Sequence, residues 1–239
     1  MRLNKEHWLL SKPIAHRGLW NESIVENSLC SYQNAIDNGY PIEIDLYSTT
    51  DGKLVSFHDS TLNRMTGVDG FIYDKSYEQL SQLNLGASTE KIPLFDQVLE
   101  LCQNKTPLLI EIKNQPDKDI VKKVVERLKT YKGEFAIQSF NPLYINQVKK
   151  LAPEFIRGIL GTNDAKEESF INRFVVKNLA FNRLIKPDFI SYSFEDLPLK
   201  KRKTKNKCLI TWTVTTEEDY LKVKGKVDNV IFEKFVPQK

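Results

Sequence analysis

The chain has 239 residues, of which 41% are hydrophobic, so it can bury a substantial core and is not expected to be intrinsically disordered. Its 35 lysines and arginines against 31 aspartates and glutamates give a formal net charge of +4, which is too small to indicate nucleic acid binding but is compatible with a small anionic ligand. The three cysteines, Cys30, Cys102 and Cys208, form no C-x-x-C pair. Their spacing argues against a disulfide framework or a zinc ribbon and favours a reducing compartment.

The segments that could direct the chain to a membrane or to nucleic acid are weak. Lys5, Glu6 and Lys12 interrupt the apolar run near the N-terminus, which therefore does not resemble a signal peptide. No segment reaches the apolar length of a membrane span, so we expect a soluble cytoplasmic protein without stable membrane insertion. The basic run Lys200–Lys207 has no interleaved aromatic residues, and we interpret it as a solvated helix end and loop, with no nucleic acid partner. The sequence gives no indication of the oligomeric state.

Eight short apolar runs that end in polar residues are predicted to be strands. In chain order they are Pro13–His16, Ile42–Leu46, Leu108–Ile112, Phe135–Gln138, Phe155–Leu160, Phe189–Ser191, Cys208–Thr213 and Asn229–Phe232. Helical spacing is found at Ser28–Asn38, Leu94–Gln103, Lys118–Tyr131, Pro142–Leu151, Lys166–Asn178, Glu195–Lys203 and Glu217–Lys224. Alternation of this kind is typical of a parallel sheet. Eight pairs in a chain of this length predict a (β/α)8 TIM barrel, with an open doubly wound sheet as the alternative.

The segment between His58 and Ile92 interrupts the alternation. It has no strong periodicity and carries Gly67, Gly70 and Gly86. We predict a single domain over residues 1–239 with a small subdomain, residues 59–92 approximately, inserted after the second predicted strand. Such an insertion would cover the C-terminal mouth of a barrel, where substrates bind in this architecture.

Charged residues alternate with apolar ones at two of the predicted strands. Glu43 and Asp45 share one face of the second strand, and Glu111 and Lys113 share one face at the third. Charges inside strands are costly unless they are paired or hold a cation. The three carboxylates therefore either bind one hard divalent cation, Mg²⁺ or Ca²⁺, or form a buried ion-pair lattice with Lys113 and no metal.

Histidines and basic residues lie next to the ends of the same strands. His16 ends the first strand and His58 follows the short run L-V-S-F, so we expect both beside the carboxylates, where two imidazoles can share general acid and base roles. Arg17 and Lys113 add positive charges suited to phosphate oxygens, whereas His7 is interpreted as structural. Together these groups indicate phosphoryl-transfer or phosphodiester chemistry.

Short motifs follow one another along nearly the whole chain. They are H-R-G at His16–Gly18, E-N-S at Glu26–Ser28, E-x-D at Glu43–Asp45, T-x-D-G-x-x-V at Thr49–Val55, H-D-x-x-L-x-R at His58–Arg64, E-I-K at Glu111–Lys113, Q-S-F-N at Gln138–Asn141 and T-W-T-V at Thr211–Val214. In this order the motifs resemble those of the glycerophosphodiester phosphodiesterase family. The sequence departs from the family pattern at Val25, where proline is usual, at Met65, which interrupts the R-T pair, and at Asn229 and Glu233, which we expect to alter the rim of the last strand.

The resemblance implies a barrel enzyme that uses a divalent cation to hydrolyse glycerophosphodiesters to glycerol 3-phosphate and an alcohol. The family mechanism is drawn as attack by the neighbouring glycerol hydroxyl to give a cyclic phosphate, which water then opens. Carried over by position, the resemblance implies that the metal ligands are Glu43, Asp45 and Glu111, that the acid–base pair is His16 and His58, that the phosphate is held by Arg17 and Lys113, and that Trp212 forms an apolar wall beside the glycerol.

Some alternatives stay open at this point. A lysophospholipase D-like or cyclising phospholipase activity on lipid phosphodiesters is a second enzymatic hypothesis, and a barrel that binds anionic headgroups without turnover is a third. We expect Gly18 to allow close approach of the backbone to a ligand. Glu26 and Asn27 are expected to brace the site, with Asn27 or Ser28 as the N-cap of the following helix.

Overall fold

The computed structural model describes residues 3–163, 179, 182–200, 204 and 207–237, and the structural statements below refer to these residues. The chain divides into two compact units. One comprises residues 15–135, and the other comprises residues 136–239 together with residues up to 14.

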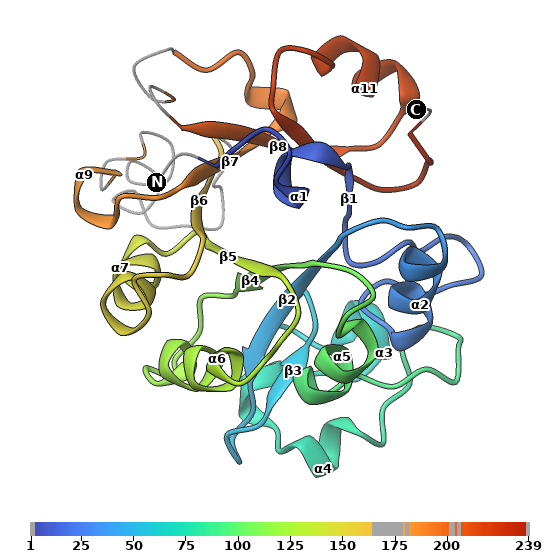
Figure 1. The fold of residues 1–239 in the computed structure, drawn as a ribbon. Coiled ribbons are helices and arrows are strands. Elements are labelled where there is room, and N and C mark those ends of the chain that lie inside the picture. Colours follow the sequence, from blue (N-terminus) through green and yellow to red (C-terminus); the bar gives the residue numbers. More distant parts are fainter. Residues whose placement is uncertain (1–2, 164–178, 180–181, 201–203, 205–206, 238–239) are drawn as a thin grey trace. The chain divides into compact units, whose positions relative to one another are not determined.

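The unit of residues 15–135 is built on β2 and β4. Its elements are β2 (Ile42–Ser48), β3 (Leu54–Ser56), β4 (Leu108–Ile112), α2 (Leu29–Asp37), α3 (Asn63–Thr66), η1 (Ile72–Asp74), α4 (Tyr77–Leu80), α5 (Phe95–Cys102) and α6 (Ile120–Lys129). β2 pairs in parallel with β4 and antiparallel with β3. Every residue of β2 and β4 is buried. α2 and α5 pack beside each other in this unit (Figure 1).

The second unit repeats a strand and helix pattern. Its elements are α1 (Trp8–Ser11), β5 (Phe135–Ser139), α7 (Pro142–Leu151), β6 (Arg157–Gly161), α9 (Asn182–Ile185), β7 (Phe189–Ser193), η2 (Phe194–Asp196), β8 (Cys208–Val214), α11 (Glu217–Val223) and β9 (Asn229–Phe232). Strands β5 to β9 pair in parallel, each with the next in chain order. The short β1 (Ile14–Ala15) lies where the chain passes from this unit to the other.

The fold class is a (β/α)8 barrel with one additional strand. Parallel strands alternate with helices along the chain, and their order in the sheet follows the sequence, whereas β3 is the additional antiparallel strand. The predicted barrel is therefore confirmed, and the alternative of an open doubly wound sheet is not the fold. Each of the eight predicted strands coincides with an observed strand to within a few residues.

The predicted helices agree less uniformly. The helix expected at Glu195–Lys203 is wrong over its described part, where η2 ends at Asp196 and Leu197 is extended. Pro198 explains this because it has no backbone N–H to donate and its ring clashes with a preceding helical turn. The helix expected at Lys166–Asn178 lies outside the described residues. Part of the basic run Lys200–Lys207 also lies outside them.

The segment between His58 and Ile92 has a small apolar core of its own. Leu62, Ile72, Leu80 and Leu85 are buried there, and they pack with buried residues of β2 and β3. The segment is made of short helical turns because its apolar residues follow no regular period. A single domain with an insertion at about residues 59–92 stays a prediction.

Asn229, one of the departures from the family pattern, has a structural role. It is the first residue of β9, and its Nδ2 donates to the backbone oxygens of Leu9, at 2.8 Å, and Lys12, at 2.6 Å. The side chain therefore ties the N-terminal segment to the start of β9. Asn229 does not lie at the carboxyl end of this strand, so the expectation that it alters the rim there is wrong.

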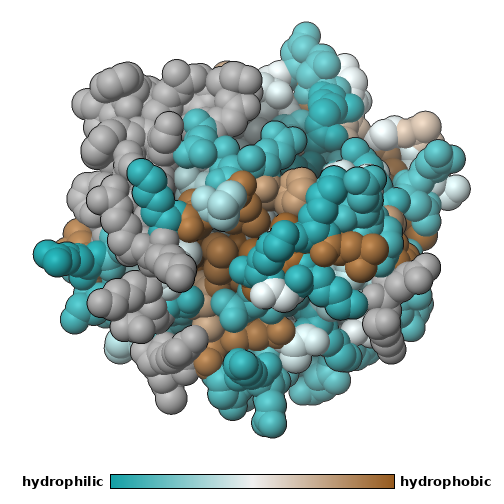
Figure 2. Space-filling model, turned by 90° about the horizontal axis from the view of Figure 1, so that it is seen from above, coloured by the Kyte–Doolittle hydropathy of each residue, from teal (hydrophilic) through white to brown (hydrophobic). Residues whose placement is uncertain are grey.

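In the part of the chain that is described, no helix has both the length and the apolar character that crossing a bilayer requires. Large exposed apolar residues are spread over separate elements, for example Leu143 on α7, Leu184 on α9 and Leu221 on α11. Figure 2 shows hydrophilic residues over most of the described surface on the face that it presents, with a smaller apolar area among them.

Candidate active site

Three buried carboxylates meet in the unit of residues 15–135. Glu43, Asp45 and Glu111 each place one oxygen so that these atoms all lie within 4.8 Å of one another. The parallel register pairs Asp45 with Glu111, and because side chains alternate along a strand, all three face the same side of the β2–β4 pair. The structure thus confirms that the sequence brings these carboxylates together.

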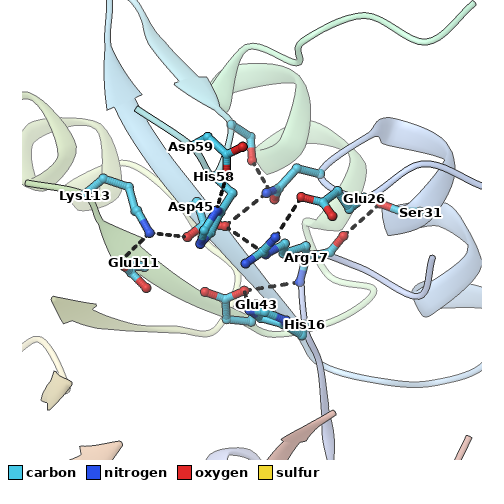
Figure 3. A network of polar contacts seen from close by, with 12 residues as sticks. His16, Arg17, Glu26, Ser31, Glu43, Asp45, His58, Asp59, Glu111 and Lys113 are labelled. Carbon is cyan, nitrogen blue, oxygen red and sulfur yellow. Dashed lines mark hydrogen bonds and ion pairs between the residues drawn. The ribbon is translucent and has the colours of Figure 1, made fainter. Parts of the chain in front are cut away.

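Lys113 and Arg17 compensate part of this negative charge (Figure 3). Lys113 Nζ lies 3.0 Å from Glu111 Oε1 and 3.3 Å from Asp45 Oδ1. Arg17 Nε lies 3.8 Å from Asp45 Oδ2, and the Arg17 backbone N–H donates to Glu43 Oε2 at 3.2 Å. Both basic residues predicted for the site therefore contact its carboxylates directly.

The shared burial moves the pKa values of the cluster apart. Burial, followed by the charges of Asp45 and Glu111, raises the pKa of Glu43 well above its ordinary value. Burial also acts on Asp45, but Lys113, His58 and Arg17 outweigh it and hold the pKa of Asp45 below its ordinary value. Within the cluster, Glu43 therefore holds its proton more strongly than Asp45 does.

The two predicted histidines also lie in this unit. His16 Nε2 is 3.9 Å from Glu43 Oε2, and His58 Nδ1 is 2.6 Å from Asp59 Oδ1. Burial, and then the charge of Lys113, lowers the pKa of His58, so its ring is neutral near pH 7. A neutral His58 donates from Nδ1 to the carboxylate, which leaves Nε2 unprotonated and able to accept a proton.

A chain of ion pairs links His58 to Arg17. Arg64 Nε donates to Asp59 Oδ2 at 2.5 Å, and Arg64 Nη2 donates to Glu26 Oε1 at 2.7 Å. Glu26 Oε1 also accepts from Arg17 Nη1 at 2.8 Å. Sequence reasoning assigned no role to Asp59 or Arg64, although both stand in the H-D-x-x-L-x-R motif, and the spacing within that motif was the available signal.

A second set of hydrogen bonds connects Asp45 to buried polar side chains of the same unit. Asn27 Nδ2 donates to Asp45 Oδ2 at 3.0 Å, and Tyr32 Oη donates to Asn27 Oδ1 at 2.8 Å. Tyr32 Oη also lies 2.6 Å from Ser56 Oγ, and all of these side chains are buried. Asn27 was expected to brace the site and does so. Tyr32 and Ser56 were missed because an isolated hydroxyl in an apolar pattern gives no signal of its partner.

The backbone around these residues is unusual. Arg17 has φ 58° and Asn27 has φ 50°, a left-handed conformation that is uncommon for residues other than glycine. The Asn27 N–H donates to the Arg17 carbonyl oxygen at 2.9 Å, which holds the two strained residues against each other. Ser28 caps α2 by accepting from the Ser31 N–H, so of the two candidate N-caps it is Ser28 that serves.

Gly18 is required by packing within the protein. Its φ is +82°, and a Cβ atom there would lie 2.4 Å from Ser31 Oγ and 2.8 Å from the Ser31 backbone carbon. We predicted that Gly18 lets the backbone come close to a ligand. In the structure, the backbone at Gly18 comes close to Ser31 of α2, and this contact is what excludes a side chain there.

Trp212 lies on β8, in the unit that contains residues 136–239. Its ring packs edge to face with Phe140 of the same unit, with 5.5 Å between the ring centroids. Its place beside a bound glycerol stays a prediction.

The donor set of the cluster fits a divalent cation. Glu43, Asp45 and Glu111 offer only oxygen, the ligand atom that Mg²⁺ and Ca²⁺ prefer. The surrounding ion pairs contain two further carboxylates, Glu26 and Asp59, against three permanent cations, Arg17, Arg64 and Lys113. When all five carboxylates are ionised, their charge exceeds that of the three cations by two, which one divalent cation would neutralise.

The fold is a (β/α)8 barrel, and acidic, basic and imidazole groups lie together in its unit of residues 15–135. The model of the glycerophosphoryl diester phosphodiesterase family matches residues 16–235, and the chain belongs to this family.

Individual relatives agree with this assignment. The chain is 35% identical over 161 residues to a glycerophosphodiester phosphodiesterase of Caldanaerobacter subterraneus, and the match covers 62% of this chain and 65% of that protein. It is 34% identical over 143 residues to a human lysophospholipase D, covering 54% of this chain and 45% of the relative. The chain therefore spans less than two thirds of the length of both.

A solved structure supports the fold. An Oleispira antarctica phosphodiesterase, determined in complex with the product sn-glycerol-3-phosphate, superimposes with a TM-score of 0.77 at 24% identity. The match covers 94% of this chain and 93% of that one. The similarity shows that the two chains share the barrel fold.

Tyr32→Phe should destabilise the protein because it leaves Asn27 Oδ1 and Ser56 Oγ without the tyrosine hydroxyl. We expect a loss of about 1–3 kcal/mol in the free energy of unfolding, measured with urea. Tyr131→Phe is the matched control, since the buried Tyr131 hydroxyl has no hydrogen-bond partner among the described residues. Equal losses in the two variants would contradict the hydrogen-bond assignment.

Glu26 should stabilise the protein in a pH-dependent way. Burial opposes its ionisation, but hydrogen bonds and charge from Arg64 and Arg17 hold the pKa of Glu26 below its ordinary value of 4.5. Its contribution is therefore fully present above that value and is lost as the pH falls through the lower folded-state pKa.

The free energy of unfolding should thus differ between wild type and Glu26→Gln by a constant amount from about pH 5.5 to 7.5, with wild type more stable. The difference should shrink as the pH falls below about 4.5, in urea titrations at each pH. A difference that widens on acidification would show that the ion pairs do not stabilise the ionised form.

Proposed function

We propose that the protein is a glycerophosphodiester phosphodiesterase that hydrolyses glycerophosphodiesters to glycerol 3-phosphate and an alcohol. One observation carries the proposal: the buried cluster of Glu43, Asp45 and Glu111 lies in one compact unit with two imidazoles and two basic side chains. Membership of the family and the name of the Caldanaerobacter relative support the same reaction.

Glu43, Asp45 and Glu111 would hold the divalent cation, Mg²⁺ or Ca²⁺. When bound, this cation supplies positive charge next to the phosphoryl oxygens, where negative charge increases in the transition state. Arg17 and Lys113 carry permanent positive charge beside the same carboxylates, and we assign them to the phosphate oxygens. The guanidinium can hold two oxygens at once, whereas the ammonium acts as a point charge.

His16 and His58 are proposed to move the protons. Phosphodiester cleavage requires a base that removes a proton from the attacking hydroxyl and an acid that protonates the leaving alkoxide. The neutral His58 ring, fixed through Nδ1 by Asp59, presents Nε2 in the form that accepts a proton. We assign the base and acid roles to the two histidines as a pair. An imidazole that has accepted a proton as the base can donate it later as the acid.

Small water-soluble diesters are the proposed substrates. Of the apolar residues in the segment between His58 and Ile92, Leu62 and Ile72 are buried in its core, and Val68 and Phe71 are the large apolar side chains exposed in the described structure of this segment. Two exposed residues do not form a lipid-docking surface. A lysophospholipase D-like or cyclising activity is the second candidate, and the similarity to the human lysophospholipase D supports the first of these two activities.

The reaction is proposed to take place in the cytoplasm. Cys30, Cys102 and Cys208 are all free thiols, and two of them are buried. Free thiols are common in reducing compartments and fit this location.

The test is release of glycerol 3-phosphate from glycerophosphocholine and glycerophosphoethanolamine by protein treated with EDTA and then supplied with Mg²⁺ or Ca²⁺. We expect release that depends on the added cation, and a kcat lowered by roughly 10²- to 10⁴-fold in His58→Asn because the acid–base group is lost. His7→Asn is the matched control: His7 caps α1 through Nδ1, and asparagine preserves such a cap.

Full activity of folded His58→Asn would contradict the assignment of His58. Choline release from lysophosphatidylcholine, without hydrolysis of the water-soluble diesters, would favour the second candidate. Absence of cleavage with any of these substrates would overturn the proposed reaction.

A further inference from the structure

We propose that Arg64 is a positioning residue of the site, which orients the His58 ring through Asp59 and the Arg17 guanidinium through Glu26. The inference rests on the proposed function, because it concerns the groups assigned to that reaction. Arg64 belongs to α3, in the segment that follows His58, and it is the residue that the two carboxylates share.

At the His58 end, Arg64 restrains both oxygens of Asp59. Arg64 Nε donates to Oδ2 at 2.5 Å, and Arg64 Nη2 donates to Oδ1 at 3.1 Å. Oδ1 is also the acceptor for His58 Nδ1 at 2.6 Å. A carboxylate held at both oxygens by a planar guanidinium cannot rotate freely, so it fixes the plane of the histidine ring.

At the other end, Arg64 holds Glu26 in a second pair of hydrogen bonds. Nη2 donates to Oε1 at 2.7 Å, and Nη1 donates to Oε2 at 3.3 Å. Glu26 Oε1 accepts from Arg17 Nη1 at 2.8 Å as well. Arg64 therefore restrains the side chain of Arg17 indirectly, through the shared acceptor Glu26. The backbone of Arg17 is in the left-handed region.

The burial of the partners separates this arrangement from an ordinary surface ion pair. The Arg64 side chain is 47% exposed, but the side chains of Asp59 and Glu26 are only 20% and 10% exposed. An exposed isolated ion pair contributes little to stability. Here one guanidinium serves two largely buried carboxylates, and each carboxylate contacts a group assigned to the reaction.

The geometry also accounts for arginine at this position. Its fork offers donors on two edges, and the structure uses Nε and Nη2 toward Asp59 and both Nη atoms toward Glu26. A lysine would supply the same charge without a planar fork, so it could not restrain two carboxylates at four oxygens. Loss of the fork should leave His58 and Arg17 in place but misoriented, which lowers kcat more than it changes KM.

The orientation of His58 can be measured without turnover. The chain has three histidines, so ¹⁵N-histidine labelling gives few ring signals, and His58→Asn identifies those of His58. In wild type at a pH where the ring is neutral, we expect the tautomer with the proton on Nδ1 to predominate. Arg64→Gln should shift the ring toward a mixture of both tautomers, and Asp59→Ala should shift it further.

The same variants are then compared in the diester assay. We expect kcat to fall roughly 10- to 100-fold in Arg64→Gln, with KM within about threefold of wild type. Arg64→Lys should lose kcat to a similar extent, because charge alone does not restore the fork. Arg127→Gln is the matched control, since Arg127 forms an ion pair with Asp96 on the surface of the same unit and touches none of the groups assigned to the reaction.

Several results would overturn the proposal. These are an unchanged His58 tautomer in folded Arg64→Gln, a kcat within about twofold of wild type in that variant, or full rescue by lysine. If Arg64→Gln does not fold, the His58 tautomer and the kcat of Arg64→Lys test the proposal in its place. A wild-type protein that cleaves no diester would instead overturn the proposed function, and the histidine spectra would still test the positioning of His58.

Discussion

The site depends on the cost of burying three carboxylates beside one another. Glu43, Asp45 and Glu111 are almost fully buried, and their oxygens lie within 4.8 Å of one another. Such a cluster is stable only with compensating positive charge and hydrogen bonds, which here come from Lys113, Arg17 and the Asn27 amide. The raised pKa of Glu43 indicates that this compensation is incomplete within the chain.

The need for compensation explains features that have no other evident cause. Arg17 and Asn27 both have left-handed backbone conformations. In these conformations the Arg17 backbone N–H donates to Glu43, and the Asn27 side-chain amide donates to Asp45. Gly18 then lets the chain pass directly against Ser31 at the start of α2. Local strain at these positions is therefore offset by the interactions that the carboxylates gain.

The barrel and the carboxylate cluster were predictable from the sequence, because both follow from simple periodicities. Residues two apart on a strand share a face, and that rule put Glu43 and Asp45 together. The expected parallel barrel strands then placed Glu111 near them. The helix at Pro142–Leu151 was predicted with its observed limits, since proline at its first position and apolar spacing mark it clearly.

The rest could not be predicted, because it depends on contacts between residues far apart in the sequence. Arg64 pairs with Glu26, and Tyr32 with Ser56, and no local pattern reveals either pair. The strand β3 was missed because a run of three residues is too short to show alternation. At Asn229 the family pattern suggested a change in the rim, but the side chain binds backbone oxygens of the N-terminal segment instead.

Calorimetric titration of the EDTA-treated protein with Mg²⁺ and with Ca²⁺ tests most directly whether the carboxylate cluster holds a cation. Wild type should bind one cation per chain, and Asp45→Asn should lose this binding because it removes one of the three ligands. Asp51→Asn, on the loop that follows β2, should bind as wild type does. Absence of binding to folded wild type, or equal binding to Asp45→Asn, would contradict a cation site at Glu43, Asp45 and Glu111.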